Sequence, residues 1–258
     1  MKIVEPSVEI IDELNVLKRI ELCGRVCYKS EDKITETSAL NFVRNIKRRG
    51  HTSVLEHARI ALSIDETKYL CEHCDSVAWK SRVKWYGLHS TINVRDFLLV
   101  FPEATIEDAA AHPPAHDLIT VRFVCDRAIA NELVRHRVFS FSQESTRYVS
   151  YREGVTFIRP VPFEWATDES SPLFGQWHFA LTAAETAYRT MICNGATPEQ
   201  ARSVLPLSTK TELVMSGLME QWWNMLRLRF DAAHAHPQMY HLMKMLVEKK
   251  PALIQPPF

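Results

Sequence analysis

The segment RHRVFSFSQESTRY, residues 135–148, gathers the side chains of this chain that are best suited to binding a small anion. Two arginines flank a histidine in the RHR triplet, four hydroxyl side chains follow, and Arg147 comes near the end. A guanidinium is a planar fork that matches a phosphate or the carbonyl edge of a pyrimidine, and an amide such as Gln143 supplies neutral donors. The alternative is a charged helix end, where cations favour the helix dipole without any ligand. Because the residues before the triplet are apolar, the segment leaves the core as a polar edge, which favours an anionic ligand.

Three other motifs are weaker signals. CEHC at residues 71–74 has half the spacing of a zinc site, but no second CxxC or HxxxH follows at the usual distance. His234 and His236, with His241, could ligate a metal, yet side chains at i and i+2 diverge on a helix. The SxxK match at residues 30–33 lies in a charged, turn-like stretch, and matches of this length arise by chance. We therefore expect no metal site and no serine nucleophile from these motifs.

Composition and charge exclude several classes of protein. The chain has 258 residues, of which 46% are hydrophobic and 24% charged, so it can bury a sizeable core. Thirty-one Lys and Arg balance 31 Asp and Glu, which argues against a protein that coats nucleic acid or an anionic membrane. The 7 glycines form neither GxGxxG nor GxxxxGK[ST], so we expect side chains to hold any phosphate. Six cysteines do not form a disulfide-scaffold pattern, and the acidic start of the chain is unlike a signal peptide. A cytoplasmic protein is expected.

The elements that must position the 135–148 segment can be read from hydrophobic periodicity. Helices are predicted at residues 37–49, 127–137, 173–194, 198–206, 218–230 and 237–249, and strands at 59–64, 119–126 and 208–216. Residues 66–118 are less regular, and we interpret them as an irregular insertion within a single domain that spans residues 1–258. The order of the elements predicts an α+β fold, an antiparallel sheet flanked by helices, and not the alternating pattern of a doubly wound sheet.

The RHR triplet is followed by seven residues and then by a serine, from Arg135 to Ser145, and this spacing resembles the signature of the flavin-dependent thymidylate synthases, the ThyX family. Further blocks that resemble the family in the same order are GHTSVLEH (50–57), ARSVLPL (201–207), NMLRLR (224–229) and, more weakly, GRVCY (24–28). The resemblance spans most of the chain except residues 66–118.

What the resemblance implies is an enzyme that makes dTMP from dUMP. Methylenetetrahydrofolate would give the one-carbon unit, and FAD reduced by NADPH would give the hydride. The resemblance also implies a homotetramer of α+β subunits, with FAD and nucleotide sites shared between chains. None of the six cysteines follows a proline, as the nucleophile of the cysteine-dependent thymidylate synthases does. The uracil ring would therefore be activated by electrostatics instead of by an enzyme cysteine.

The resemblance assigns roles to residues motif by motif. Arg229 would activate the uracil ring, and His51 would lie beside the flavin and the pterin. The residues that would contact FAD are Ser53, Arg135, His136, Arg137, Val138, Gln143 and Asn224. The residues that would contact dUMP are Glu132, Leu133, Val134, Arg135, Gln143, Glu144, Ser145, Thr146, Arg147, Arg202 and Arg229. Because no histidine follows Ser145 within the motif, we expect this serine to form hydrogen bonds and not to act as a nucleophile.

Three positions depart from the family pattern. Glu132 stands where many relatives have Gln, and Leu218 replaces a frequent Asn, which weakens one FAD contact. One extra residue precedes His234, to which we assign no role. A rival hypothesis from another class is a non-catalytic protein that binds nucleotides or RNA through the RHR triplet. The zero net charge and the lack of aromatic residues interleaved with a basic stripe disfavour that reading.

Overall fold

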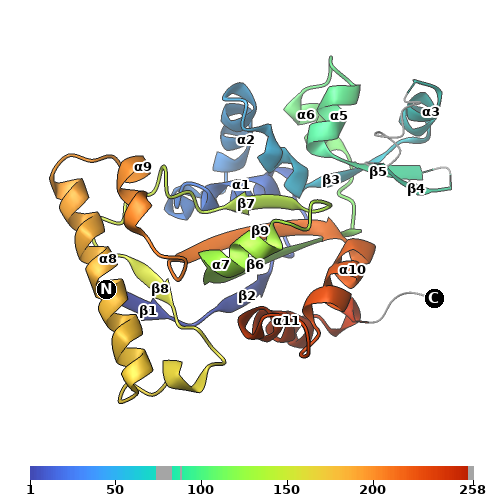
Figure 1. Ribbon diagram of the computed structural model, residues 1–258. Coiled ribbons are helices and arrows are strands. Elements are labelled where there is room, and N and C mark those ends of the chain that lie inside the picture. Colours follow the sequence, from blue (N-terminus) through green and yellow to red (C-terminus); the bar gives the residue numbers. More distant parts are fainter. Residues whose placement is uncertain (74–82, 88, 255–258) are drawn as a thin grey trace.

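The centre of the molecule is a four-stranded antiparallel sheet (Figure 1). The computed structural model describes residues 1–73, 83–87 and 89–254. The strands, in the order in which they pair, are β2 (Ser7–Ile10), β6 (Leu118–Asp126), β9 (Lys210–Leu218) and β7 (Ser140–Gln143). Strands β6 and β9 are 9 residues long and pair along their whole length, whereas the short β7 pairs with β9 at the edge. The expected α+β fold with an antiparallel sheet is confirmed.

One face of this sheet forms the main apolar core. It is covered by α7 (Arg127–Leu133), α10 (Met219–Arg229) and α11 (Pro237–Lys249). Successive side chains of a strand alternate between faces, and Phe123, Leu213 and Met215 pack on this one. Trp222 of α10 is fully buried among them, and its indole N–H donates to the carbonyl of Ile119 at 3.3 Å. The polar atom of the largest core side chain is thus satisfied, which keeps its burial favourable.

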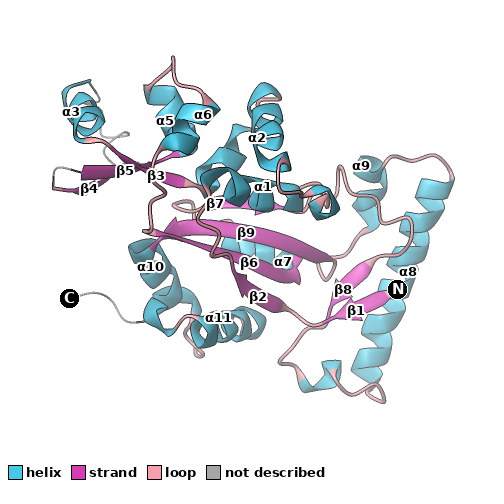
Figure 2. Cartoon of the chain, turned by 180° about the vertical axis from the view of Figure 1, so that it is seen from behind, coloured by secondary structure: helices cyan, strands magenta, loops and turns pink. Residues whose placement is uncertain are grey.

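The opposite face carries polar as well as apolar contacts. It packs against α1 (Val16–Val26), α2 (Ser38–Arg48) and the 3-10 helix η2 (Thr52–His57), and Figure 2 shows these helices across the sheet from α11. Gly24 lets α1 approach η2 closely, because a Cβ atom at this position would lie 2.6 Å from Val54 and 2.9 Å from Phe42. Any larger residue at Gly24 would push α1 away from the segment that carries His51 and Ser53.

A second layer continues from α2 and η2. It consists of the three-stranded sheet β3 (Arg59–Leu62), β5 (His89–Asn93) and β4 (Lys84–Tyr86), with α3 (Ile64–His73), α5 (Val94–Val100) and α6 (Ile106–Ala111). Ile60, Ile92 and Phe97 share one buried cluster with residues of α1 and α2. The 66–118 stretch therefore contains regular helices and strands that pack on the rest of the chain. Cys74 and Trp79, which the sequence patterns singled out, lie outside the described residues.

The remaining elements lie at the end of the sheet where β7 runs into residues 144–148. They are the parallel pair β1 (Lys2–Val4) and β8 (Thr156–Ile158), the helices α8 (Pro172–Cys193) and α9 (Pro198–Ala201), and the 3-10 helices η1 (Glu31–Lys33), η3 (Glu164–Ala166) and η4 (Arg202–Val204). The 3-10 helix η5 (Pro251–Leu253) instead packs against α10 and α11. Helix α8 begins with Ser171 as N-cap and Pro172 in its first turn, and Gly195 with φ +90 follows its end, as the sequence predicted. No helix among the described residues is long and apolar enough to cross a membrane.

Candidate active site

The RHR triplet lies in a loop and not in a helix. Asp126 caps α7 by accepting a hydrogen bond from the amide of Ile129 at 2.8 Å, and the helix ends at Leu133. Two consecutive turns follow, in which the amide of His136 donates to the carbonyl of Leu133 and that of Phe139 donates to the carbonyl of His136. The predicted helix over residues 127–137 is therefore four residues too long. Because the cations of the triplet lie beyond the helix, capping does not account for them.

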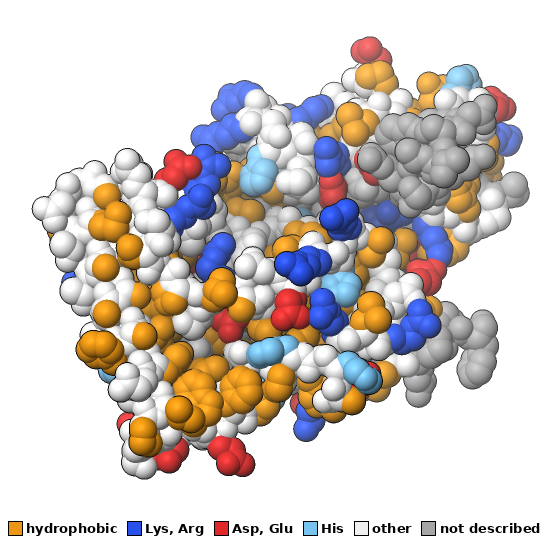
Figure 3. All heavy atoms as spheres, in the orientation of Figure 1, with side chains coloured by type: hydrophobic (Ala, Val, Ile, Leu, Met, Phe, Trp, Pro, Cys, Tyr) orange, Lys and Arg blue, Asp and Glu red, His pale blue; other side chains and the backbone are white. Residues whose placement is uncertain are grey.

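Arg229, at the end of α10, joins Glu132 and His136 in one cluster. Its Nη1 forms an ion pair with Glu132 Oε2 at 2.9 Å, and its Nε donates to His136 Nε2 at 3.1 Å. Burial lowers the pKa of His136, and the positive charge of Arg229 lowers it further. The imidazole is thus neutral near pH 7, with Nε2 as acceptor and the proton on Nδ1. Figure 3 shows charged and histidine side chains gathered over α7 and the adjoining end of α10.

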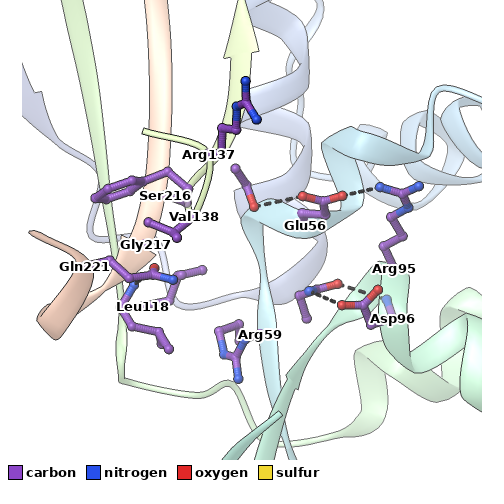
Figure 4. Close-up of a pocket in the computed structure, with 14 residues that line it drawn as sticks. Glu56, Arg59, Arg95, Asp96, Leu118, Arg137, Val138, Ser216, Gly217 and Gln221 are labelled. Carbon is purple, nitrogen blue, oxygen red and sulfur yellow. Dashed lines mark hydrogen bonds and ion pairs between the residues drawn. The ribbon is translucent and has the colours of Figure 1, made fainter. Parts of the chain in front are cut away.

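A cavity of about 380 Å³ adjoins the triplet on the other side (Figure 4). Its lining residues are Glu56, Arg59, Asn93, Arg95, Asp96, Leu118, Arg137, Val138, Phe139, Ser140, Ser216, Gly217, Leu218 and Gln221. Three arginines and two carboxylates line it together with amides and hydroxyls, so it is strongly polar. Gly217 is required at its base, because a Cβ atom there would overlap the ring of Phe139. Leu218 lines the cavity, whereas the exposed Asn224 does not.

The η2 segment is tied to β7 and β9 through a buried histidine. His57 is fully buried, and its two ring nitrogens lie 2.7 Å from Ser216 Oγ and 2.9 Å from Ser142 Oγ. Burial lowers the pKa of His57 to about 3, so the ring is neutral. Beside it, Glu56 accepts a hydrogen bond from Ser140 at 3.0 Å and pairs with Arg95. These contacts fix η2, and with it the exposed Ser53, against the strand that follows the RHR triplet.

His51, just before η2, contacts a different part of the site. Its Nδ1 lies 2.8 Å from the hydroxyl of Tyr28, and the two rings meet edge to face at 5.9 Å. Burial lowers the pKa of His51 and raises that of Tyr28. Tyr28 also packs on Tyr148 at 5.6 Å, and the amide of Ser145 donates to the carbonyl of Cys27 at 3.2 Å. The structure thus brings GRVCY, His51 and the end of the 135–148 segment together.

Residues 144–147 follow β7 and lie, with its last residue Gln143, at the end of that strand opposite to the RHR triplet. Gln143 donates to Thr211 Oγ1 at 3.3 Å, and buried Glu144 binds Tyr151 at 2.7 Å and Lys210 at 2.8 Å. Both carboxylate oxygens of Glu144 therefore have partners within the chain, whereas a residue that binds the nucleotide directly needs a polar atom available to it. Ser145 is half-buried and Thr146 is buried.

Two predicted nucleotide contacts, Arg147 and Arg202, are exposed. Arg147 forms an ion pair with Glu199 of α9 at 2.7 Å, and Arg202 begins η4 directly after that helix. By contrast, Leu133 is fully buried in the main core and Val134 packs against the same core. These two side chains have structural roles, so only their backbone groups remain for a ligand.

Sequence patterns missed several side chains that the fold places at the site. Arg127 begins α7, and its buried Nη1 has no hydrogen-bond partner among the described residues. The charge of Arg127 acts on Tyr151, whose pKa is raised first by burial and then by the neighbouring Glu144. Arg95 and Gln221 line the cavity and belong to no motif. Only the topology of the chain reveals them.

The weaker motifs have structural explanations. Exposed His234 binds Asp231 at 2.8 Å, and the ring of His236 accepts from the amide of Gln238 at the start of α11. Cys71 is exposed on α3. Within residues 1–73, 83–87 and 89–254, no group of three or more His, Cys, Asp and Glu side chains is placed to hold a metal ion.

Comparison with known proteins identifies similar chains. The family model described as "Thymidylate synthase complementing protein" matches residues 9–74 and 91–252, so the unmatched internal stretch is limited to residues 75–90. The flavin-dependent thymidylate synthase of Geobacter sulfurreducens is 26% identical over 204 residues, which cover 76% of this chain and 61% of that protein. The enzyme of the same name from Mycobacterium sp. strain JLS is 24% identical over 231 residues, 81% of this chain and 66% of that protein. This chain thus spans less than two thirds of the length of either relative.

A solved structure with the same overall extent is the UMP/dUMP methylase PolB from Streptomyces cacaoi bound with 5-Br dUMP. It is 19% identical, with a TM-score of 0.48, and the alignment covers 98% of this chain and 95% of that one.

Proposed function

The chain belongs to the family of the flavin-dependent thymidylate synthases, and from this membership we propose that it catalyses the reductive methylation of dUMP to dTMP. The reaction would use FAD as cofactor, with methylenetetrahydrofolate and NADPH as co-substrates, in the cytoplasm. The observation that carries the proposal is the cluster of Arg229, Glu132 and His136 directly beside the RHR triplet. Two segments far apart in sequence, residues 132–137 and the end of α10, meet there.

Arg229 is the residue that we assign to activation of the uracil ring. Without a cysteine that adds to C6, C5 becomes nucleophilic only when negative charge gathers on N3 and the flanking carbonyls. A guanidinium keeps its charge at any working pH and presents five N–H donors in a plane. Glu132 and His136 use donors on Nη1 and Nε, which fixes the plane of the group. The remaining donors can then stabilise the charge that develops on the pyrimidine.

The neutral ring of His136 would carry its proton on Nδ1, the nitrogen that does not accept from Arg229. Because its Nε2 accepts from the guanidinium, its Nδ1–H remains a donor toward a ligand. The lowered pKa keeps the ring neutral, so it places no second positive charge beside Arg229. Glu132 balances the charge of Arg229 through Nη1, and the donors on Nη2 remain for a bound pyrimidine.

The polar cavity is where we place part of the FAD. Ligand sites usually measure about 300–1,000 Å³, and the 380 Å³ of this cavity is at the lower end of that range. Arg137 and Arg95 suit a diphosphate, and Gln221 and Asn93 suit a ribityl or ribose chain. When bound, FAD supplies the hydride. The absence of a side chain at Gly217 makes room for the ring of Phe139, which packs there and lines the cavity.

A shared site between chains follows from the separation of its two halves. The RHR triplet and residues 144–147 flank the four residues of β7, a separation of about 10 Å along a strand that rises roughly 3.3 Å per residue. The two halves of the predicted nucleotide site thus lie at opposite ends of β7, an arrangement that suits a site completed by a neighbouring chain. We propose that dUMP binds between subunits of a homotetramer, with Ser145, Arg147, Arg202 and Arg127 on its phosphate side.

Two measurements on the purified protein test this proposal. The protein should be yellow, release flavin on denaturation, and convert dUMP to dTMP when methylenetetrahydrofolate and NADPH are present. A colourless protein that takes up no FAD on reconstitution and yet binds nucleotides would support the non-catalytic binding protein instead. If the protein binds flavin but forms no dTMP with any reductant, the assigned reaction is refuted, while the assignment of FAD as cofactor is retained.

A further inference from the structure

A second hollow, which we call the α2 groove, has a volume of about 630 Å³ and is separate from the cavity at the RHR triplet. It is lined by the end of α1, by η1 and by one face of α2. The lining residues are Arg25, Tyr28, Ser30, Lys33, Thr35, Thr37, Ser38, Asn41, Phe42, Asn45, Ile46 and Arg49. The α2 members recur every three to four residues from 37 to 49, so the groove follows the helix for about 18 Å at 1.5 Å per residue.

The charge of the α2 groove is positive throughout. Its lining includes three cations and no carboxylate, in contrast to the cavity at the RHR triplet. Arg25 is held in place by buried Glu21 at 2.7 Å and lies over the ring of Phe42 at 4.5 Å. Lys33 and Arg49 are exposed, and neither forms an ion pair within the part of the chain that the structure describes. Figure 3 shows Lys and Arg side chains gathered over α2.

The neutral lining suits a carboxylate ligand. Ser30, Thr35, Thr37, Asn41 and Asn45 place hydroxyl and amide donors along the groove. Such donors complement carboxylate oxygens without adding charge, and cations at both ends provide long-range attraction. A single small anion would need only one of these ends. The length and the separated cations favour an extended ligand that carries several negative groups.

The α2 groove begins at the candidate active site. Tyr28 forms its inner wall, and the Tyr28 hydroxyl lies 2.8 Å from His51 Nδ1. A ligand that has one end beside His51 can therefore continue past Tyr28 into the groove.

We propose that the α2 groove binds the γ-glutamyl tail of the folate co-substrate, with Lys33 and Arg49 pairing its carboxylates. This inference rests on the proposed function, which names methylenetetrahydrofolate as co-substrate, and on the place beside His51 that the family resemblance implies for the pterin. Each additional glutamate adds one carboxylate, so affinity should rise with tail length until the groove is filled. Exposed ion pairs are individually weak, and two of them together should change affinity by about 5- to 10-fold.

The experiment compares mono- and pentaglutamyl 5-methyltetrahydrofolate, which bind but do not react, on the flavin-loaded protein by calorimetry. We expect the pentaglutamate to bind about 5- to 10-fold more tightly than the monoglutamate at low salt. The preference should shrink as salt rises, because exposed charges are screened. In the double variant Lys33→Gln and Arg49→Gln the preference should fall below about twofold, with flavin absorbance unchanged.

A matched control uses Lys47→Gln with Arg48→Gln, which removes two charges from the same helix outside the lining of the groove. This variant should keep the tail-length preference. The inference is wrong if wild type shows no preference, or if the preference survives in the Lys33 and Arg49 variant.

Turnover with the monoglutamate separates this inference from the proposed function. An enzyme that makes dTMP but ignores tail length retains its function and loses the groove assignment. If no dTMP forms with either folate, the function fails, and binding of free penta-γ-glutamate decides the groove alone. Loss of that binding in the Lys33 and Arg49 variant, but not in the control, would support the groove; equal binding in both would refute it.

Discussion

His57 and His136 lie at opposite sides of β7, and their surroundings differ in one decisive respect. His57 has no exposed surface, and both of its ring nitrogens are satisfied by serine hydroxyls from the sheet. His136 is half-buried in a loop, and one of its nitrogens contacts Arg229, which is itself partly exposed. The first histidine completes its hydrogen bonds within the chain. The second belongs to a cluster that still has donors for a ligand.

This difference separates structural from functional polar groups in the whole molecule. Buried Glu212 resembles His57, because Lys29 at 2.6 Å and Arg122 at 2.8 Å satisfy its carboxylate and lower its pKa to about 2. Arg127 and Arg229 resemble His136, since part of each guanidinium has no partner in the described chain. Satisfied buried groups stabilise the fold, whereas incompletely satisfied ones mark where a ligand binds.

The largest effect is expected at Arg229. In Arg229→Ala the protein should fold and keep its flavin, but dTMP formation should fall at least about a hundredfold, because a donor matched to developing charge is lost. Lysine should rescue poorly, since a point charge cannot contact N3 and a carbonyl together. Steady-state kinetics with dUMP and the flavin spectrum measure both.

Arg227→Ala is the control for Arg229, because Arg227 lies in the same last turn of α10 and contributes equally to the helix dipole. Its turnover should stay within a fewfold of wild type. If the turnover of Arg229→Ala also stayed within a fewfold of wild type, Arg229 would have only a structural role, like His57. The proposed difference between the surroundings of His57 and His136 would then be wrong.

At His57 we expect an effect on stability. It should be smaller than the effect on rate at Arg229. His57→Gln should lower the free energy of unfolding by about 1–3 kcal/mol, because the buried serine hydroxyls lose well-placed partners. The pKa of His57 is lowered to about 3 in the fold, against an ordinary 6.5. Between these values the unfolded chain binds the extra proton, so wild-type stability should fall as pH drops from 6.5 toward 3, by at most about 1.4 kcal/mol per pH unit.

Denaturant unfolding of wild type and His57→Gln between pH 7 and 5 isolates this contribution as the difference between the two profiles, because His51 and His136, whose pKa values are also lowered, act in both proteins. The carboxylate of Glu212 releases its stabilisation only as pH falls through about 4.5 toward 2. The His57→Gln variant should show a flatter stability profile over that interval than wild type. Equal slopes for the two proteins would mean that His57 is not held neutral, contrary to its contrast with His136.

The smallest effect is expected at Ser145. Ser145→Ala should keep measurable turnover and raise the KM for dUMP by about 5- to 10-fold, the cost of one hydrogen bond of roughly 1 kcal/mol. Kinetics at saturating and limiting dUMP separate KM from kcat. A covalent adduct between the nucleotide and Ser145, detected by mass spectrometry, would contradict this role.

Regular periodicity predicted most of the long elements. The helix at residues 237–249 has the predicted bounds, and strand β6 differs from its predicted range by one residue. Strand β9 lies two residues further along than predicted. The helix before the RHR triplet was predicted too long, because its charged residues continue the helical composition although the core contact ends at Leu133. Local composition carries no information about where such a contact stops.

The site was only partly predictable for a related reason. Motif spacing led to Arg229, His136 and His51, and the structure brings the first two together. Motif spacing could not reveal Arg95 and Arg127, because their importance comes from the start of α5 and the start of α7 folding beside the motif. Strand β7 was not predicted either, because its four residues, in which polar and apolar side chains alternate, lie inside the motif itself.

The strand order β2–β6–β9–β7 also has a consequence for how the protein is made. Strand β9, at residues 210–218, inserts between β6 and β7, which the ribosome produces much earlier. Until that late segment emerges, β7 has no neighbouring strand in this sheet, and only earlier elements such as α1 and η2 can contact it. Contacts so distant in sequence fold slowly and leave strand edges exposed meanwhile. Assembly of the catalytic loop is thereby postponed to one of the last steps of biosynthesis.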